Sequence, residues 1–505
     1  MRGTVGFMSR ARAVALTVGV AAAALLLPAV PGEADDAGNG SAVARVDQQM
    51  IETFVREQTR RNGIPGLAMA VADKSGTLMS RGFGTADGQG RPVTARTPFV
   101  LASVSKPLTA TAVMQLVDAG RIKLDAPVQR YLPEFRVADA VASRAITVQE
   151  LLTHTSGLPA SGCERDADSL QEFVAQLRTV TLDAPVGSRY IYCSGNYNVL
   201  GRLVERVSGQ SFADYMREHV FAPLHMAHSY ASEAPARADG LAQGHRWIFG
   251  EVTPMSYYNP SGVPSGYLVS TAADMAHFLT ASLNGGRYRT ARILSARSVS
   301  IMQRSWVDTG DGGTYGLGWH QGQLGGVTAV YHYGENYNTE TLAFLEPATG
   351  RGAVILVNGQ GLLAVPALRS IETGVARMLA NENPGKPAMS VGTAYVLFDT
   401  LVLATAIAAL LPLFRLSRWR RSLQGRARLR RRTLARVAGE LTLPMITLVA
   451  IQVLLGMIGA TWREMFRLVP DVMTWLTGLC VLVFLAGTAH AVLAVQQARD
   501  RRAAG

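Results

Sequence analysis

The chain has 505 residues, of which 48% are hydrophobic, and its formal net charge is +12. The positive charge is uneven, because residues 415–440 hold ten arginines against one glutamate and most of the remaining excess lies at the two ends. The nearly neutral middle argues against a nucleic-acid-binding protein and indicates that the arginines flank membrane segments.

The N-terminus has the pattern of an export signal. Three arginines within residues 2–12 precede an apolar stretch at 13–27, and a small-x-small cleavage site follows at 32–34. We therefore predict a signal peptide over residues 1–34 and a polar linker at 35–45. An uncleaved membrane anchor is the alternative.

Residues 46–380 have the mixed composition of a globular enzyme. Near the start of this region, two apolar runs separated by a turn predict a β-hairpin over residues 66–84. A helical pattern follows from Leu108 to Leu116, and two more strands are expected late in the region, at 341–345 and 353–358. Strands at both ends with helices between them predict an α+β fold built on an antiparallel sheet.

Three long apolar segments follow a linker at residues 381–390. Each reaches about 20 residues, the length that a helix needs to cross a bilayer, and buried core helices are the alternative. The first segment contains Asp399, which we interpret as a structural polar residue. The segments lie at residues 391–414, 441–460 and 472–495.

The arginines orient these three segments. The loop 415–440 and the tail 496–505 carry the positive charge that is typical of cytoplasmic segments. An exported domain followed by three spans and a cytoplasmic tail agrees with the export signal. We therefore expect a multi-pass plasma-membrane protein that contacts the lipid bilayer through three C-terminal helices. Its domain 46–380 would face the extracytoplasmic side.

The segment Ser103-Val104-Ser105-Lys106 contains a candidate nucleophile, Ser103, and a candidate base, Lys106. Residues three apart lie on one face of a helix, and a serine hydroxyl needs a base before it becomes a nucleophile. Lysine can act as that base when its surroundings lower its pKa, whereas arginine cannot. Pro107 is tolerated only in the first turn of a helix. The helix should therefore begin near Ser103, at the positive end of its dipole.

Six segments in consistent order resemble the class C β-lactamase and penicillin-binding-protein family of serine hydrolases. The resemblance covers roughly residues 50–380. It implies a β-lactamase/transpeptidase-like antiparallel sheet flanked by helices, with an all-α subdomain. The sequence contains no cofactor fingerprint, so we expect no cofactor. The segments are PFVLASVSKPLTATAVMQLVDAGRIKLDAPVQRYLPEF, ITVQELLTHTSGLP, YIYCSGNYNVLG, YLVSTAADMAHFL, YGLGW and HYG.

The family's Tyr-x-Asn element falls on Tyr192-Cys193-Ser194. The resemblance implies that Tyr192 is the general acid and base that passes a proton to the leaving group, next to Lys106. Ser194 stands at the substrate-binding position where the family has asparagine. A hydroxyl is shorter than an amide and cannot donate and accept in the same geometry, which weakens a specific claim of β-lactamase activity.

The family's Lys-Thr-Gly or His-x-Gly element falls on His332-Tyr333-Gly334. The resemblance implies that His332 sets the polarity of the catalytic network and that Gly334 lets a substrate backbone approach. It also implies that the backbone amides of Ser103 and Glu335 form the oxyanion hole.

His154 offers an alternative mechanism, a Ser/His/Asp triad with Ser103 or Ser156. The family uses this segment as a structural turn, which disfavours the triad. Cys163 and Cys193 are candidates for a disulfide, with two separate thiols as the alternative. The nine histidines lack the HxxxH and HExxH spacings, so we predict no metal site.

The sequence thus predicts an acyl-transfer enzyme that works through an acyl-enzyme on Ser103. Its substrates would be small molecules or peptides: cell-wall D-alanyl peptides, β-lactams, D-amino-acid peptides or small esters. The alternative is a catalytically weak peptidoglycan-binding or sensory protein that signals through its membrane helices. A transporter-like use of the three spans is disfavoured, because they contain one acidic residue and no repeat.

Overall fold

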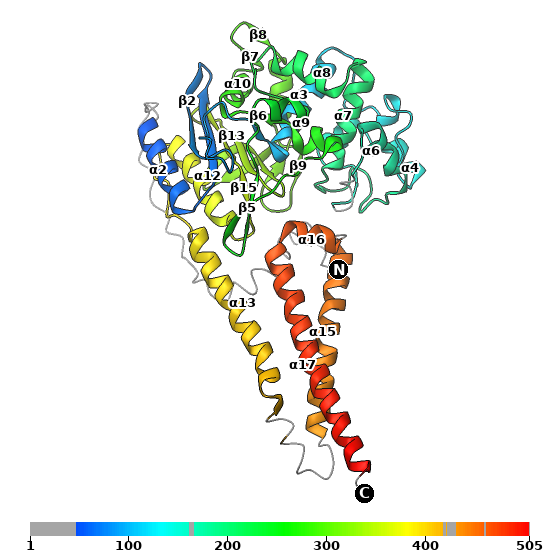
Figure 1. Ribbon diagram of the computed structural model, residues 1–505. Helices are drawn as coiled ribbons and strands as arrows, with labels where there is room; N and C mark the ends of the chain where they lie inside the picture. Colours follow the sequence, from blue (N-terminus) through cyan, green and yellow to red (C-terminus); the bar gives the residue numbers. More distant parts are fainter. Residues whose placement is uncertain (1–46, 161–165, 418–420, 422–430, 459–460, 504–505) are drawn as a thin grey trace. The chain divides into compact units, whose positions relative to one another are not determined.

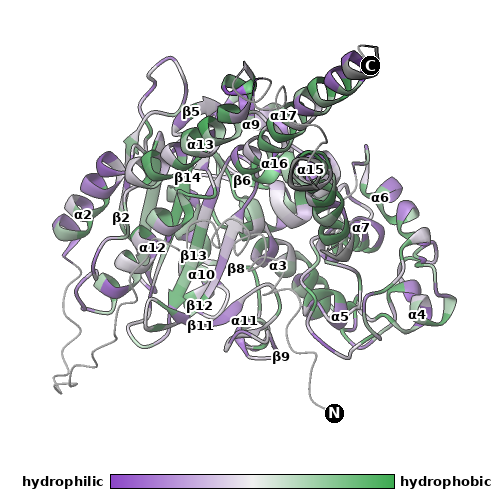
Figure 2. Ribbon diagram, turned by 90° about the horizontal axis from the view of Figure 1, so that it is seen from below, coloured by the Kyte–Doolittle hydropathy of each residue, from purple (hydrophilic) through white to green (hydrophobic). Residues whose placement is uncertain are grey.

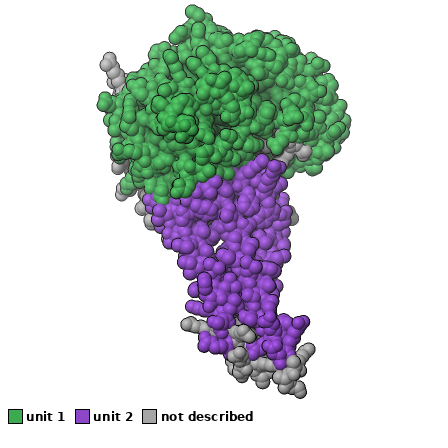
Figure 3. Space-filling model, in the orientation of Figure 1, with its two compact units in different colours: residues 1–247, 251–392 green, residues 248–250, 393–505 purple. Residues whose placement is uncertain are grey.

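The computed structural model describes residues 47–160, 166–417, 421, 431–458 and 461–503. The expected signal peptide, the linker at 35–45, Cys163 and most of the arginine-rich loop lie outside these residues. The chain divides into two compact units, coloured in Figure 3. One contains residues 1–247 and 251–392, and the other contains residues 248–250 and 393–505.

The first unit is built on an eight-stranded antiparallel sheet in the order β2-β1-β14-β13-β12-β11-β10-β9 (Figure 1). The expected hairpin is its β1–β2 edge, and the two late strands are β13 and β14. The strands are β1 Gly66–Asp73, β2 Gly76–Gly84, β9 Val307–Asp308, β10 Thr314–Tyr315, β11 His320–Leu324, β12 Val327–Glu335, β13 Glu340–Glu346 and β14 Arg351–Val357. The α+β prediction is confirmed.

Successive side chains along a strand point to opposite faces of the sheet. At the centre of the sheet both sets are buried, because helices cover both faces. Helix α10 (Ala272–Leu283) packs on one face, and α2 (Gln48–Arg61) and α12 (Val365–Leu379) pack on the other. The set that joins the core around α10 is Ala68, Ala70, Ala72, Val354 and Leu356. The alternate set, also buried, is Leu67, Met69, Val71, Ile355 and Val357.

The helical subdomain is inserted between β3 (Phe99–Val100) and β6 (Val269–Ser270), which pair with each other. It contains the segments that carry Ser103, Lys106 and Tyr192. Its short helix α5 begins with a capping box, in which Thr147 and Glu150 satisfy each other's backbone amides. The helices are α3 Ser105–Asp118, α4 Ala140–Ala145, α5 Val148–Leu152, α6 Leu170–Gln176, α7 Gly195–Ser208, α8 Phe212–Tyr215 and α9 Glu233–Ala238; α11 Ala296–Gln303 follows α10.

The second unit contains three helices that are long and apolar enough to cross a membrane, at Val391–Phe414, Val437–Gly456 and Pro470–Asp500. They belong to α13 Val391–Phe414, α15 Arg431–Ile458 and α17 Pro470–Ala503, and the short α16 Trp462–Leu468 precedes α17. Figure 2 shows α17 with hydrophilic residues toward its C-terminal end.

Helices α15 and α17 pack against each other at a glycine. A Cβ added to Gly487 would lie 2.9 Å from the backbone carbon of Glu440. The Glu440 carboxylate in turn lies 2.6 Å from Nδ1 of His490, whose side chain is buried. The close approach therefore depends on the missing side chain at position 487.

Candidate active site

Ser103 lies in a 3-10 turn, Ala102–Val104, that runs directly into α3. The turn replaces the first α-helical turn expected there, and Pro107 follows at the third position of α3. Two polar groups meet the Ser103 hydroxyl: Lys106 Nζ donates to Oγ at 3.0 Å, and the Tyr192 hydroxyl donates to it at 2.8 Å. Tyr192 comes from the loop before α7. The structure thus brings together the three residues that the sequence singles out.

Lys106 is fully buried, and oxygen atoms surround its amine. Nζ donates to the carbonyl oxygen of Ser265 at 2.7 Å and lies 3.4 Å from Ser194 Oγ. A neutral amine has two N–H groups and one lone pair. If Lys106 is neutral and its two N–H groups bond to Ser265 and Ser194, its lone pair is left to take up the proton of Ser103. This arrangement suits proton uptake from the serine.

The backbone before Ser103 is held in an uncommon conformation. Ala102 has a φ of 45°, in the left-handed region that disfavours a residue with a Cβ. Leu101 is fixed on both sides: its N–H donates to the Leu268 carbonyl at 2.8 Å, and its own carbonyl accepts from Thr341 Oγ1 at 2.7 Å. Such local strain persists only where the surroundings determine it, and it occurs at functional sites.

Gly334 brings strand β12 against the turn Ala102–Val104 that contains Ser103. A Cβ at this position would lie 2.6 Å from the Leu101 carbonyl oxygen and 3.0 Å from the Ser103 nitrogen. The glycine is therefore required for protein packing, a reason that the sequence did not give. The next residue, Glu335, ends β12 with an exposed side chain. The amides of Ser103 and Glu335 thus belong to two backbone segments that meet at Gly334.

His332 is buried and neutral. Its Nδ1 donates to the Tyr333 carbonyl at 2.6 Å, so its Nε2 accepts from the Tyr315 hydroxyl at 3.1 Å. Burial, with the nearby His320 and Lys106 as smaller causes, holds the pKa of His332 well below its usual range. Its ring centroid lies 6.3 Å from that of Tyr192. His332 therefore borders the tyrosine, while its two nitrogens bond to Tyr333 and Tyr315.

His154 lies beneath Tyr192, a role that the sequence did not indicate. Its Nδ1 accepts from the Cys193 amide at 3.2 Å and from Asn196 Nδ2 at 3.1 Å. Burial, with Lys106 as a smaller cause, holds the pKa of His154 well below its usual range. Ser156 donates to the other end of the same amide, Asn196 Oδ1, at 2.7 Å. The alternative triad is therefore not assembled on Ser156.

Cys193 and Ser194 connect Tyr192 to α7, and Ser194 is the N-cap residue of that helix. The Ser194 hydroxyl lies toward Lys106. Cys193 is disulfide-bonded, and Cys480 is free. Cys163, the expected partner of Cys193, lies outside the described residues. Among the residues that the structure describes, no group of three metal-ligating side chains is found.

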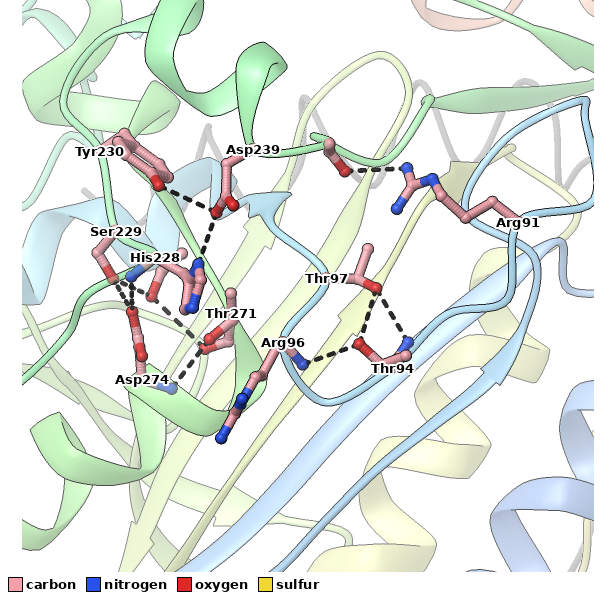
Figure 4. A network of polar contacts seen from close by, with 12 residues as sticks. Arg91, Thr94, Arg96, Thr97, His228, Ser229, Tyr230, Asp239, Thr271 and Asp274 are labelled. Atoms are coloured by element: carbon pink, nitrogen blue, oxygen red, sulfur yellow. Dashed lines mark hydrogen bonds and ion pairs between the residues drawn. The ribbon is translucent and has the colours of Figure 1, made fainter.

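A polar network joins the segment 228–239 to the start of α10, near strand β6 (Figure 4). Asp274, in the first turn of α10, accepts from the His228 amide at 2.8 Å. Asp239 accepts from His228 Nδ1 at 2.8 Å and from the Tyr230 hydroxyl at 2.9 Å. Tyr230 also pairs with Val269 of β6 through backbone hydrogen bonds. Because β6 pairs with β3, the network holds the strand that leads into the turn at Ser103.

The model of the Beta-lactamase family matches residues 51–373. The chain belongs to this family. The resemblance inferred from the sequence is thereby confirmed, and the family is one of serine hydrolases with a serine β-lactamase-like fold.

Individual relatives agree with this assignment. Penicillin-binding protein 4 of Amycolatopsis lactamdurans is 35% identical over 319 residues, which cover 59% of this chain and 81% of that protein. Protein flp of Staphylococcus aureus (strain MW2) is 25% identical over 320 residues. That match covers 62% of this chain and 63% of flp, less than two thirds of its length.

Among solved structures, the chain is similar to the octameric penicillin-binding protein homologue from Pyrococcus abyssi. The TM-score is 0.59 at 25% sequence identity, over 68% of this chain and 79% of that one.

Proposed function

We propose that this protein is a membrane-anchored serine hydrolase that forms an acyl-enzyme on Ser103. The observation that carries the proposal is the position of the Ser103 hydroxyl between Lys106 Nζ, at 3.0 Å, and the Tyr192 hydroxyl, at 2.8 Å. A nucleophile with two proton carriers in hydrogen-bond reach is what acyl transfer requires.

In the proposed reaction, Ser103 Oγ attacks the substrate carbonyl carbon as its proton passes to Lys106 Nζ. The amides of Ser103 and Glu335 bind the oxyanion. The scissile C–N or C–O bond breaks as Tyr192 gives its hydroxyl proton to the leaving group, and the proton held on Lys106 restores that hydroxyl. Water then cleaves the acyl-enzyme in the reverse sense and regenerates Ser103.

The proposed substrates are amides or esters, with cell-wall D-alanyl peptides, β-lactams and small esters as the classes to test. The name of the Amycolatopsis relative, a penicillin-binding protein, favours the first two. Ser194 leaves a short hydroxyl beside Lys106 where an amide would reach further. An open position of this kind also suits a bulkier ester acyl group.

The proposed location is the plasma membrane, with the hydrolase domain on the extracytoplasmic face. Three helices of sufficient length and apolarity support anchoring. The arginines between the first and second helices, and those at the C-terminus, support a cytoplasmic position for both segments.

Active-site labelling tests the proposal on the full chain in detergent micelles. The protein is treated with a fluorescent penicillin and, separately, with a fluorophosphonate, and the intact mass is measured. Ser103→Ala should abolish every adduct, whereas Ser156→Ala, which removes the other serine considered as a nucleophile, should keep them.

A penicillin adduct on Ser103 would support cell-wall or β-lactam substrates. A fluorophosphonate adduct alone would support an esterase. A folded protein that forms neither adduct would contradict acyl transfer and favour the binding or sensory alternative.

A further inference from the structure

A buried charge cluster lies behind the strand end that carries Gly334 and Glu335, and the proposed reaction does not use it. At its centre is Arg369, in the first turns of α12. The guanidinium forms ion pairs with Glu335, with Glu340 at 3.0 Å and with Glu372 at 3.0 Å. Its central carbon also lies 3.3 Å from the centroid of the Tyr333 ring.

Two of the three carboxylates that Arg369 contacts are buried, so they depend on Arg369 for their charge pairing. The side chain of Glu340 is 0% exposed and that of Glu372 is 2% exposed, whereas Glu335 reaches solvent with 35% exposure. A carboxylate removed from water is costly unless it is paired. Arg369 can serve several carboxylates at once because its planar fork has five N–H donors. Removing that one cation would leave like charges facing each other.

The cluster sits where β12 turns into β13. Glu335 and Glu340 are directly opposite each other in the two strands, the last pair of that ladder. Like charges in such a position repel and would open the hairpin end. Arg369 offsets the repulsion and ties both strands to α12. Its stacking on Tyr333 holds β12 two residues before Glu335 as well.

We propose that Arg369 is a positioning residue for acyl transfer, which holds the Glu335 amide at the distance from the Ser103 amide that an oxyanion requires. The inference rests on the proposed function, in which those two amides form the oxyanion hole. Only Gly334 separates Tyr333, which Arg369 contacts, from Glu335. Gly334, between Tyr333 and Glu335, already packs against the Ser103 nitrogen. A shift of Glu335 relative to Gly334 therefore changes the spacing of the two donors directly.

The expected consequence is a loss in kcat with little change in KM. An oxyanion forms only in the transition state, so a displaced donor weakens transition-state binding and leaves substrate binding intact. Complete removal of one oxyanion donor costs about 100- to 1000-fold in kcat. A donor that is loosened rather than removed should cost less, and we expect about 10- to 100-fold for Arg369→Gln.

The test compares variants of the full chain in detergent, with a chromogenic ester as substrate. Arg369→Gln removes the cation, and Arg369→Lys keeps the charge but loses the fork and the stacking. In case Arg369→Gln does not fold, the triple variant Arg369→Gln, Glu340→Gln, Glu372→Gln removes the buried charges together. Arg351→Gln is the matched control: Arg351 is also buried and donates to α12, at the Leu379 carbonyl, but it lies in β14, which β13 separates from β12 in the sheet.

The ratio of rates on the ester and on its thionoester, in which sulfur replaces the carbonyl oxygen, separates positioning from folding. Sulfur is a weak acceptor and gains little from the oxyanion donors. A misplaced donor slows the reaction of the ester more than that of the thionoester. The ester-to-thionoester rate ratio should therefore fall most in Arg369→Gln and less in Arg369→Lys. It should stay unchanged in Arg351→Gln. Partial unfolding lowers both rates equally.

An unchanged ratio, or wild-type kcat in all Arg369 variants, would overturn the inference while Ser103 is still labelled. If wild-type Ser103 formed no adduct, the proposed function itself would fail.

Discussion

Tyr192 lies flat against His154, with the two ring centroids 4.5 Å apart and the ring planes inclined by 30°. The same histidine accepts a hydrogen bond from the amide of the next residue, Cys193. The ring and the backbone of the Tyr192 loop are therefore both held by one buried side chain. That double contact places the hydroxyl of Tyr192 within reach of Ser103.

We expect His154→Phe to lower kcat by about 10- to 100-fold, because misplacing a reacting group costs rate steeply. Phenylalanine keeps the stacking but removes the acceptor, so the Cys193 amide loses a hydrogen bond at a cost of about 1–3 kcal/mol. Steady-state kinetics on a chromogenic ester would measure the effect. His277→Phe is the control, because His277 stacks on Tyr288 at 4.6 Å elsewhere in the core. Equal kcat in the two variants would show that His154 is only a packing residue.

Gly334→Ala should abolish Ser103 labelling or slow it by at least about 100-fold. The new Cβ would lie 2.6 Å from the Leu101 carbonyl oxygen, so β12 and the turn at Ser103 must separate. The rate of fluorophosphonate labelling measures this directly. Gly88→Ala serves as control, because its nearest contact would be an ordinary 3.7 Å to a flexible side chain. Normal labelling of Gly334→Ala would mean that the strand and the turn need not touch.

Local sequence signals predicted the parts of the site that lie close together in the chain. The spacing of Ser103 and Lys106, the edge hairpin and the long apolar helices each follow from periodicity or turn residues within one segment. Tyr192 and His332 were found through matched motifs, since nothing in their own neighbourhoods indicates that they meet Ser103.

The remaining features depend on contacts between distant segments. The partner of Lys106 at Ser265 is a backbone carbonyl, which any residue could supply. The role of His154 depends on a left-handed backbone, with a φ of 60°, which is uncommon for a residue other than glycine. Arg369 is one of many arginines, and only the packing of α12 brings it to Glu335. A single sequence contains no separate signal for such approaches.

The contribution of Glu372 to the stability of the hydrolase unit should fall as the pH rises from about 5 to 8. Burial raises the pKa of this carboxyl from 4.5 to about 7, despite the opposing effect of Arg369. Between these values the folded state binds more protons than the unfolded state. The stabilising contribution is therefore complete below pH 4.5 and is lost as the pH passes 7.

Its size is at most about 3 kcal/mol, at 1.36 kcal/mol for each pKa unit. Thermal unfolding midpoints of wild type and Glu372→Gln at several pH values would measure it. The variant should show a flatter pH dependence. Parallel curves for the two proteins would contradict the assignment to Glu372.

The pairing of α15 with α17 should depend on Gly487. Leucine at this position would place its Cβ 2.9 Å from the Glu440 backbone, which forces the helices apart and separates Glu440 from His490. We expect Gly487→Leu to make the membrane helices of the reconstituted full chain more sensitive to protease and to lower their thermal unfolding midpoint. Ser103 labelling by the fluorophosphonate should be unchanged, because Ser103, Lys106 and Tyr192 belong to the other unit. Gly478→Leu, on the same helix at a position with open space, is the matched control. Equal protease sensitivity of the two variants would show that the helices do not require the close approach at Gly487.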